Sequence, residues 1–225
     1  DDTGTVDGGV QPTHEFGGIG GILGDLVFVG HIGAEVGGVA CAKRSDGLCC
    51  FQAVDVERCD FAAMGDDVLG DDPTVQRLEA VFAERFGMEA GLFCPSGTMT
   101  NQIAVKVHTR PGDELFCSKL AHVYNYEGGG LAFNSGVQVR VGGDDYGRLS
   151  AAEAESLLQP MDNVHAAPTR LVVAENTSNK GGGTTLGLPA LQELGAFART
   201  HGLGYHLDGA RLFNALVADR ERPED

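Results

Sequence analysis

Between residues 73 and 219, short apolar segments alternate with segments of helical periodicity, and this alternation constrains the fold more than any other feature of the chain. The segment RLVVAEN, residues 170–176, is apolar without alternation, which indicates a strand buried on both faces. Strands separated by helices form parallel sheets that are covered by helices on both sides. The sequence therefore predicts an α/β fold, with a mostly parallel sheet in a three-layer α/β/α arrangement.

Capping residues and apolar stripes place the expected helices. In GDDPTVQRLEAVFAERFG, Asp72 is an N-cap, Pro73 opens the helix, and one apolar stripe runs along it. Ser150 and Glu153 form a capping box before a second helix. Two further helices are expected over residues 96–109 and 188–202, and strands over residues 90–94, 115–118, 137–141, 170–176 and 205–209.

Composition limits the classes of partner. The formal net charge of −16 over 225 residues argues against binding to nucleic acid or anionic membranes, because both require a basic face. Apolar runs are shorter than a membrane span. The six cysteines contain no Cys-x-x-Cys pair, which favours free thiols in a reducing compartment over a disulfide framework or zinc site. We therefore expect a cytoplasmic protein, with no metal site and no nucleic-acid or membrane partner.

The composition changes near residue 42. Residues 1–41 contain 12 of the 34 glycines and neither lysine nor arginine. The run GGIGGILG lacks the Lys-Ser/Thr of a phosphate-binding P-loop, so a poorly structured N-terminal extension is the favoured interpretation. The expected organisation is an extension over residues 1–41, which packs poorly on the core, followed by a partial large domain over residues 42–225.

Polar residues follow several of the expected strands, where ligands gather in sheets of this type. The segment CPSGTMTNQ places Ser96, Gly97 and Thr98 at the start of a helix, where hydroxyls and backbone N–H groups bind anions. Simple capping by Ser96 is the alternative. His122 follows another strand, beside two tyrosines and Glu127, and by itself is equally consistent with a structural histidine.

Two more polar segments follow the strands at residues 170–176 and 205–209. AENTSNKGGG carries Glu175, Asn176 and Asn179, for which turn formation is the alternative to a ligand role. HLDGARLFNA carries Asp208 and Arg211 at the end of an apolar strand.

A buried carboxylate such as Asp208 requires a positive partner. That partner is either Arg211 or a bound cation. A phosphate at Ser96–Thr98 and a cation facing Asp208 can belong to one molecule, because pyridoxal phosphate has both a phosphate and a ring nitrogen that an aspartate keeps protonated. A metal site built from His206, Asp208 and Glu175 is a rival interpretation, although a third histidine or cysteine ligand is missing from the pattern.

Five segments in order, GDDVLGDDPTV, LFCPSGTMTNQ, AHVYNYEGG, ENTSNKGGG and HLDGARLFNA, resemble the consecutive motifs of the threonine aldolase/β-eliminating lyase family. The resemblance covers residues 65–219 and extends weakly to RSD at residues 44–46, where Gly47 replaces the family's threonine. It implies a pyridoxal 5'-phosphate enzyme with an aspartate-aminotransferase-like large domain, incomplete at the C-terminus. Such enzymes cleave L-threonine or L-allo-threonine to glycine and acetaldehyde, and the full-length protein is expected to be a homodimer or homotetramer.

The resemblance also implies roles for individual residues. Ser96, Gly97 and Thr98 match the segment that binds the cofactor phosphate. His122 matches the histidine stacked on the pyridine ring, and Asp208 matches the partner of the ring nitrogen. Catalytic roles are thus implied for His122, Asp208 and Arg211.

Arg211 matches an arginine near the cofactor's phenolic oxygen and the substrate carboxylate. By the same resemblance, Ser45 contacts that carboxylate.

Two departures from the family pattern affect the expected activity. Ser178 stands where many members carry a histidine near the substrate hydroxyl. The family's Schiff-base lysine follows the DGARLFNA motif in a segment after Asp225, and Lys106, Lys119 and Lys180 match no catalytic position. We therefore expect these 225 residues alone to be inactive on L-threonine.

Two alternatives to a threonine aldolase stay open. One is a β-eliminating lyase that acts on an aromatic or sulfur amino acid with the same cofactor. The other is a non-enzymatic fragment that holds only the cofactor or pairs with a partner subunit.

Overall fold

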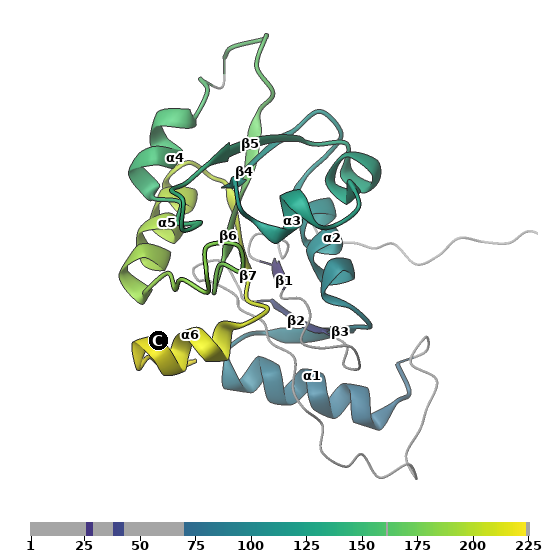
Figure 1. Ribbon diagram of the computed structural model, residues 1–225. Helices are drawn as coiled ribbons and strands as arrows, with labels where there is room; N and C mark the ends of the chain where they lie inside the picture. The colour runs from purple at the N-terminus through teal and green to yellow at the C-terminus, as the bar shows by residue number, and fades with distance from the viewer. Residues whose placement is uncertain (1–25, 29–37, 43–69, 161, 224–225) are drawn as a thin grey trace, which may run out of the picture.

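The computed structural model describes residues 26–28, 38–42, 70–160 and 162–223, and its centre is a parallel sheet of four strands in the order β5-β4-β6-β7 (Figure 1). Every pairing in this sheet is parallel. The mostly parallel α/β sheet expected from the sequence is therefore confirmed. The strands are β4 (Glu114–Ser118), β5 (Gln138–Gly142), β6 (Thr169–Glu175) and β7 (Gly204–Asp208).

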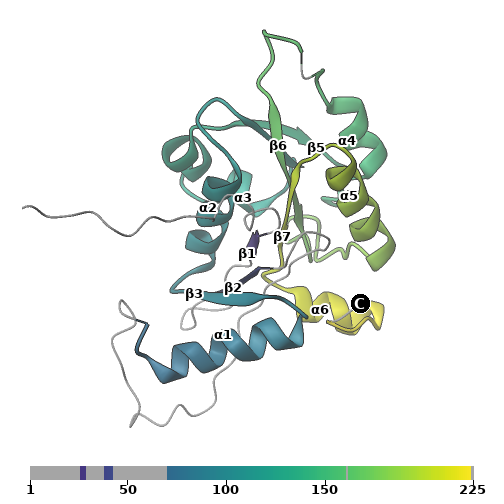
Figure 2. The same cartoon turned by 180° about the vertical axis from the view of Figure 1, so that it is seen from behind.

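Helices cover both faces of this sheet, as Figures 1 and 2 show from opposite sides. On one face lie α4 (Ala151–Leu157) and α5 (Leu188–Thr200). On the other lie α2 (Gly97–His108), the short helix α3 (His122–Asn125) and the π-helix η4 (Leu131–Ser135). The three-layer arrangement follows from these two helical layers.

The strands are apolar without alternation because each face packs against its own helical layer. Phe116, Val172 and Leu207 belong to the core on the α4 and α5 side. Leu115 and Val173 belong to a second core with residues of α2, α3 and η4. Successive side chains of a strand point to opposite faces of the sheet. In β7, Leu207 belongs to the core on the α4 and α5 side, so its neighbours His206 and Asp208 face α2.

A second, three-stranded antiparallel sheet differs from the sequence expectation of one sheet. It has the order β1-β2-β3, with β1 (Leu26–Phe28), β2 (Gly38–Ala42) and β3 (Ala90–Cys94). The physical reason lies in the burial of β3, whose first four residues alternate between exposed and partly exposed before the buried Cys94, whereas all five residues of β4 are buried. Such alternation is typical of antiparallel strands that have one covered face.

Helix α1 (Pro73–Arg85) covers this second sheet and ends near α6 (Leu212–Asp219) (Figure 1). Asp72 caps α1 as expected, because its carboxylate accepts hydrogen bonds from the N–H groups of Thr74 and Val75. The helix approaches β3 so closely that a Cβ atom on Gly91 would lie 2.7 Å from a backbone oxygen of α1. A glycine at position 91 is therefore needed for this contact.

The capping box before α4 is only half formed. Ser150 Oγ accepts a hydrogen bond from the N–H of Glu153 at 3.2 Å. The Glu153 carboxylate does not return the contact but accepts from the N–H of Gly143 at 2.9 Å. Glu153 thereby joins the start of α4 to the end of β5.

Within the described residues, no helix is both long and apolar enough to cross a membrane. In the region 1–41, the description is limited to the strand segments 26–28 and 38–41, and the poor packing of this extension stays a prediction.

Truncation of Phe82 tests whether α1 shares the main core. Its side chain is 1% exposed and lies 6.1 Å from the Phe86 ring, centre to centre. We expect Phe82→Ala to lower the free energy of unfolding by about 3–5 kcal/mol. Val81→Ala, at a neighbouring position that is 44% exposed, should cost only about 0.5 kcal/mol. Urea denaturation measures both, and equal effects would contradict a core role for α1.

Candidate functional site

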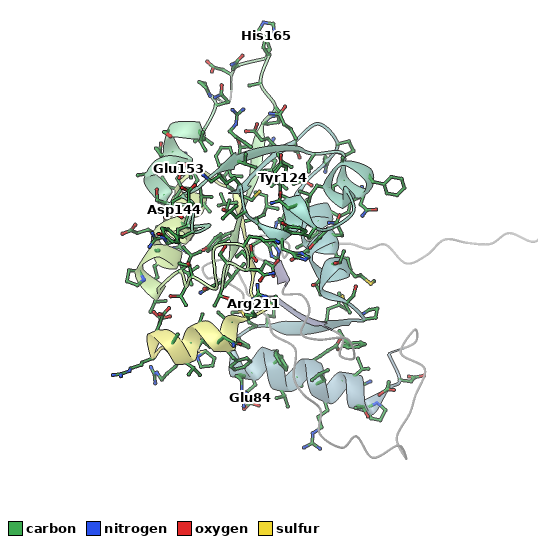
Figure 3. The ribbon with its side chains drawn as sticks, in the orientation of Figure 1. Glu84, Tyr124, Asp144, Glu153, His165 and Arg211 are labelled. Carbon is green, nitrogen blue, oxygen red and sulfur yellow. The ribbon has the colours of Figure 1, made fainter. Side chains whose placement is uncertain are left out.

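The candidate site is a pocket at the carboxyl ends of β4, β6 and β7, facing the start of α2. It gathers residues from four separate segments of the chain. Figure 3 shows one of them, Arg211, where the chain passes from β7 into α6. The pocket is lined by Gly97, Thr98, Asn101, His122, Glu175, Asn179, Asp208, Ala210 and Arg211.

Asp208 is the most deeply buried charged group in this pocket, with 2% of its surface exposed. Its carboxylate accepts hydrogen bonds from Asn101 Nδ2 at 2.9 Å and from the N–H of Ala210 at 3.2 Å. Burial, together with the nearby Glu175 carboxylate, raises the pKa of Asp208 to about 7. Among the described residues, Asp208 has no ion-pair partner, and a cationic ligand in the pocket would supply one.

Arg211 is not the partner of Asp208, although the sequence allowed that ion pair. Its guanidinium lies 3.7 Å from the carboxylate of Glu175 and donates to the hydroxyl and carbonyl oxygens of Thr177. About a third of the side chain, 36%, is exposed. Arg211 is thus held at the pocket wall with part of its guanidinium accessible.

Glu175 connects three parts of the site at the end of β6. One carboxylate oxygen accepts from the backbone N–H of His122 at 3.2 Å, and the other from the N–H of Asn179, also at 3.2 Å. The same carboxylate pairs with Arg211. Burial raises the pKa of Glu175, while these donors act in the opposite direction. The turn-forming role considered for this segment is real, and it also positions pocket residues.

His122 lines the pocket and is held by a buried carboxylate. Its Nδ1 lies 3.1 Å from Oε1 of Glu127, and its ring lies 5.7 Å from that of Tyr126. The hydrogen bond to Glu127 raises the pKa of His122, and burial opposes the shift. His122 is therefore more than a buried structural histidine, because its ring borders the same space as Asp208.

The start of α2 forms the opposite wall. Ser96 caps the helix, since its Oγ accepts from the N–H of Met99 at 3.2 Å, which is the alternative role considered for it. Gly97 and Thr98 line the pocket itself. The first N–H groups of a helix lack partners within the helix, and together with the helix dipole they favour an anion here.

Sequence reasoning missed Asn101, which lies one turn beyond Gly97. Asn101 is 1% exposed, and its Nδ2 donates to both Asp208 and Glu127, the latter at 2.7 Å. Its Oδ1 lies 2.8 Å from Nε2 of His206. The spacing of four residues from Gly97 was a signal that could have placed Asn101 on the pocket face of α2.

Other residues singled out in the sequence lie elsewhere. Ser178 is buried in its own loop, where its Oγ accepts from the N–H of Gly181 at 3.3 Å. Lys180 lies over the ring of Tyr126, with Nζ 4.8 Å from the ring centre, and it does not line the pocket. Ser45, predicted to contact the substrate carboxylate, lies outside the described residues.

The metal site considered from the sequence does not form as proposed. Nε2 of His206 is used by Asn101 and is not turned to the pocket. Ligand atoms of His122, Glu127 and Asp208 do lie within 4.8 Å of one another. Glu127 already accepts hydrogen bonds from Asn101 and Gln102 and contacts His122, so it has a role within the protein without a metal.

The pocket residues fit pyridoxal 5'-phosphate. The start of α2 suits a phosphate, and the buried Asp208 suits a protonated ring nitrogen. The exposed part of Arg211 suits a carboxylate. This assignment rests on the carboxylate of Asp208, which has no ion-pair partner among the described residues. Neither helix capping nor turn formation explains why a carboxylate is buried at this position.

Comparisons with known proteins agree with the geometry. Residues 53–225 match the family described as beta-eliminating lyase. A low-specificity L-threonine aldolase of Arabidopsis thaliana is 40% identical over 160 residues, which cover 70% of this chain and 45% of that protein. The low specificity L-threonine aldolase of Escherichia coli K12 is 40% identical over 158 residues, covering 70% and 46%. The chain thus spans less than half the length of these relatives.

Solved structures share the fold. A crystal structure from Exiguobacterium sp. 255-15, named for aromatic amino acid beta-eliminating lyase/threonine aldolase, has a TM-score of 0.57 and 25% identity. A crystal structure from Listeria monocytogenes, named for L-allo-threonine aldolase, has a TM-score of 0.59 and 21% identity. Each match covers 75% of this chain and 45% of the other.

The raised pKa of Asp208 predicts a specific pH dependence of stability without added cofactor. Between the ordinary value of 3.8 and about 7, the folded state binds a proton that the unfolded state has lost. Stability from this group therefore falls as pH rises through that window. Asp208→Asn removes the effect, so the variant should gain about 4 kcal/mol relative to the parent between pH 4 and pH 8.

His122 contributes to this comparison in the same direction. Its raised pKa also makes stability fall with rising pH, and although the hydrogen bond to Glu127, the main cause of that shift, is present in both proteins, the charge of Asp208, a lesser cause, is removed in the variant. Urea denaturation at several pH values gives the difference. If the difference in unfolding free energy between the two proteins does not vary with pH, burial does not raise the pKa of Asp208.

Proposed function

The chain belongs to the beta-eliminating lyase family, and on that premise we propose that it carries the cofactor site of a pyridoxal 5'-phosphate-dependent lyase that cleaves L-threonine and L-allo-threonine to glycine and acetaldehyde. The observation that carries the proposal is the buried carboxylate of Asp208, which has no cationic partner among the described residues. A pyridinium nitrogen supplies that missing charge.

Asp208 accepts a hydrogen bond from the ring nitrogen and keeps it protonated. With a cation in place, the pKa of Asp208 falls and the carboxylate is ionised. When bound, the protonated cofactor ring withdraws electrons from the α-carbon of the substrate. Asp208 therefore acts on the reaction through a charge that the fold holds in a dry environment.

The other pocket residues bind and orient. The N–H groups at Gly97 and Thr98 hold the phosphate, and this anchors one end of the cofactor. His122, fixed by Glu127, covers the ring and excludes water from one side. Arg211, fixed by Glu175 and Thr177, binds the substrate carboxylate through its accessible N–H groups.

L-threonine is favoured over aromatic or sulfur amino acids because the relatives that match over 70% of this chain are named for it. A β-eliminating lyase remains the alternative within the same family. The homodimer or homotetramer and the cytoplasmic location stay predictions from the sequence.

We further propose that the amine that anchors the cofactor lies outside the described residues. The three lysines that the structure describes are used elsewhere. Lys106 Nζ donates to the carbonyl of Asn134, Lys119 pairs with Asp145, and Lys180 lies over Tyr126.

Cofactor affinity tests the role of Asp208. Asp208→Ala should bind pyridoxal 5'-phosphate at least about tenfold more weakly, because a hydrogen bond between charged groups is lost. Asp145→Ala is the control, since that carboxylate is 92% exposed and pairs only with Lys119. Equilibrium dialysis at pH 7.5 gives both constants. Equal affinities in the two variants would remove the basis of the proposed site.

Threonine cleavage tests the position of the amine. With added pyridoxal 5'-phosphate, the 225 residues alone should release no glycine from L-threonine, and borohydride should not fix the cofactor at a single lysine. A chain that includes the family's downstream lysine should do both. Glycine release by the 225 residues that is lost in Lys180→Ala would show instead that Lys180 is the amine.

A further inference from the structure

We propose that Asn101 is a positioning residue whose single amide group orients both Asp208 and Glu127, and that His206 fixes the direction of that amide. This inference rests on the proposed function, because the group that Asp208 serves is the ring nitrogen of the cofactor. Asn101 lies within the first two turns of α2, and it joins that helix to the ends of β7 and of the α3 segment.

The direction of the Asn101 amide follows from its neighbours. Two carboxylates lie on one side, with Glu127 Oε1 at 2.7 Å and Asp208 Oδ2 at 2.9 Å. Ionised carboxylates only accept hydrogen bonds, so the NH₂ group must face them. The amide oxygen then faces His206 Nε2 at 2.8 Å, and that nitrogen must carry the proton.

His206 is suited to hold this tautomer. It is fully buried, and burial lowers its pKa to about 3, with the nearby His108 acting in the same direction. A neutral imidazole has one donor nitrogen, and here the donor is Nε2. His206 and Asp208 lie two residues apart on the same face of β7, so both reach α2.

The amide of Asn101 has no N–H donor left for a ligand. One N–H goes to each carboxylate, and the oxygen accepts from His206. Asn101 lines the pocket, but it acts through Asp208 and Glu127. Its bond to Asp208 favours the ionised carboxylate and leaves the remaining lone pairs directed to the ring nitrogen.

The same amide couples the two sides of the cofactor. Glu127 accepts from Asn101 and also holds Nδ1 of His122, which borders the pocket. A displacement of Asn101 therefore affects both the group beneath the ring nitrogen and the group on the ring face. Without this amide, Asp208 and Glu127 would be two buried carboxylates in mutual repulsion.

The test follows the protonation of a bound probe. Pyridoxine 5'-phosphate labelled with ¹⁵N in the ring has no aldehyde, so it binds without a lysine. Its ¹⁵N chemical shift reports the pH at which the ring nitrogen loses its proton. In the parent chain this pKa should be higher when the probe is bound than when it is free, and Asp208→Ala should lower it.

Variants of Asn101 and His206 should then differ in the pKa of the bound ring nitrogen. Asn101→Ala should lower the pKa of the bound ring nitrogen by about one unit and weaken probe binding about tenfold, because the carboxylate keeps the proton instead. His206→Leu should shift this pKa in the same direction. His206→Gln should stay close to the parent, since its amide still donates to Asn101.

Asn176→Ala is the matched control. It removes another amide that is 1% exposed, whose two hydrogen bonds go to the backbone of Leu186. It should lose stability and keep the ring-nitrogen pKa. If Asn101→Ala does not fold, His206→Leu and His206→Gln provide the test. Equal pKa values of the bound ring nitrogen in these two variants would overturn the inference.

The outcomes distinguish this inference from the proposed function. If Asp208→Ala lowers the ring-nitrogen pKa but Asn101→Ala does not, Asn101 is not a positioning residue and the cofactor site stands. If the bound probe in the parent titrates like the free probe, and Asp208→Ala changes nothing, the proposed function fails and the role of Asn101 falls with it.

Discussion

The burial of Asp208 at the end of β7 is the constraint on which the rest of the site depends. A carboxylate in this position is costly unless it is hydrogen-bonded and faced by a positive charge. The fold supplies the hydrogen bonds through Asn101 and the N–H of Ala210. It directs Arg211 to Glu175 instead. Among the described residues, Asp208 is therefore a buried carboxylate without an ion pair, in a pocket that opens to a ligand.

The carboxylates at the ends of the neighbouring strands β6 and β7 have different roles. Glu175 holds other pocket residues in place, and Asp208 is available to a ligand. Glu175 ends β6 and holds the backbone of His122, the loop at Asn179 and the side chain of Arg211. Asp208 ends β7 in register with Glu175. Because Glu175 pairs with Arg211, Asp208 is left available to a ligand. The repulsion between them adds to the raised pKa of Asp208.

The sequence predicted the layers and most of the strands, since strand burial and helix caps are local signals. RLVVAEN showed by its uniform apolar character that β6 is covered on both faces, and Asp72 marked the start of α1. The separate antiparallel sheet could not be predicted, because it depends on pairing with β2. The role of Asn101 was also invisible, because its partner Asp208 is 107 residues away and the direction of an amide follows from its neighbours.

The loop after β6 holds Ser178, for which the sequence resemblance implies a position where many family members carry a histidine. Its Oγ accepts a hydrogen bond from the N–H of Gly181, and its own N–H donates to the carbonyl of Thr184. A Cβ atom on Gly147 would lie only 2.1 Å from that Oγ, so the close approach of this loop to residue 147 requires a glycine there. Among the described residues, His122 is then the one imidazole that lines the pocket. Its link to Glu127, and through Asn101 to Asp208, makes the protonation of this base part of the same buried network that serves the cofactor ring.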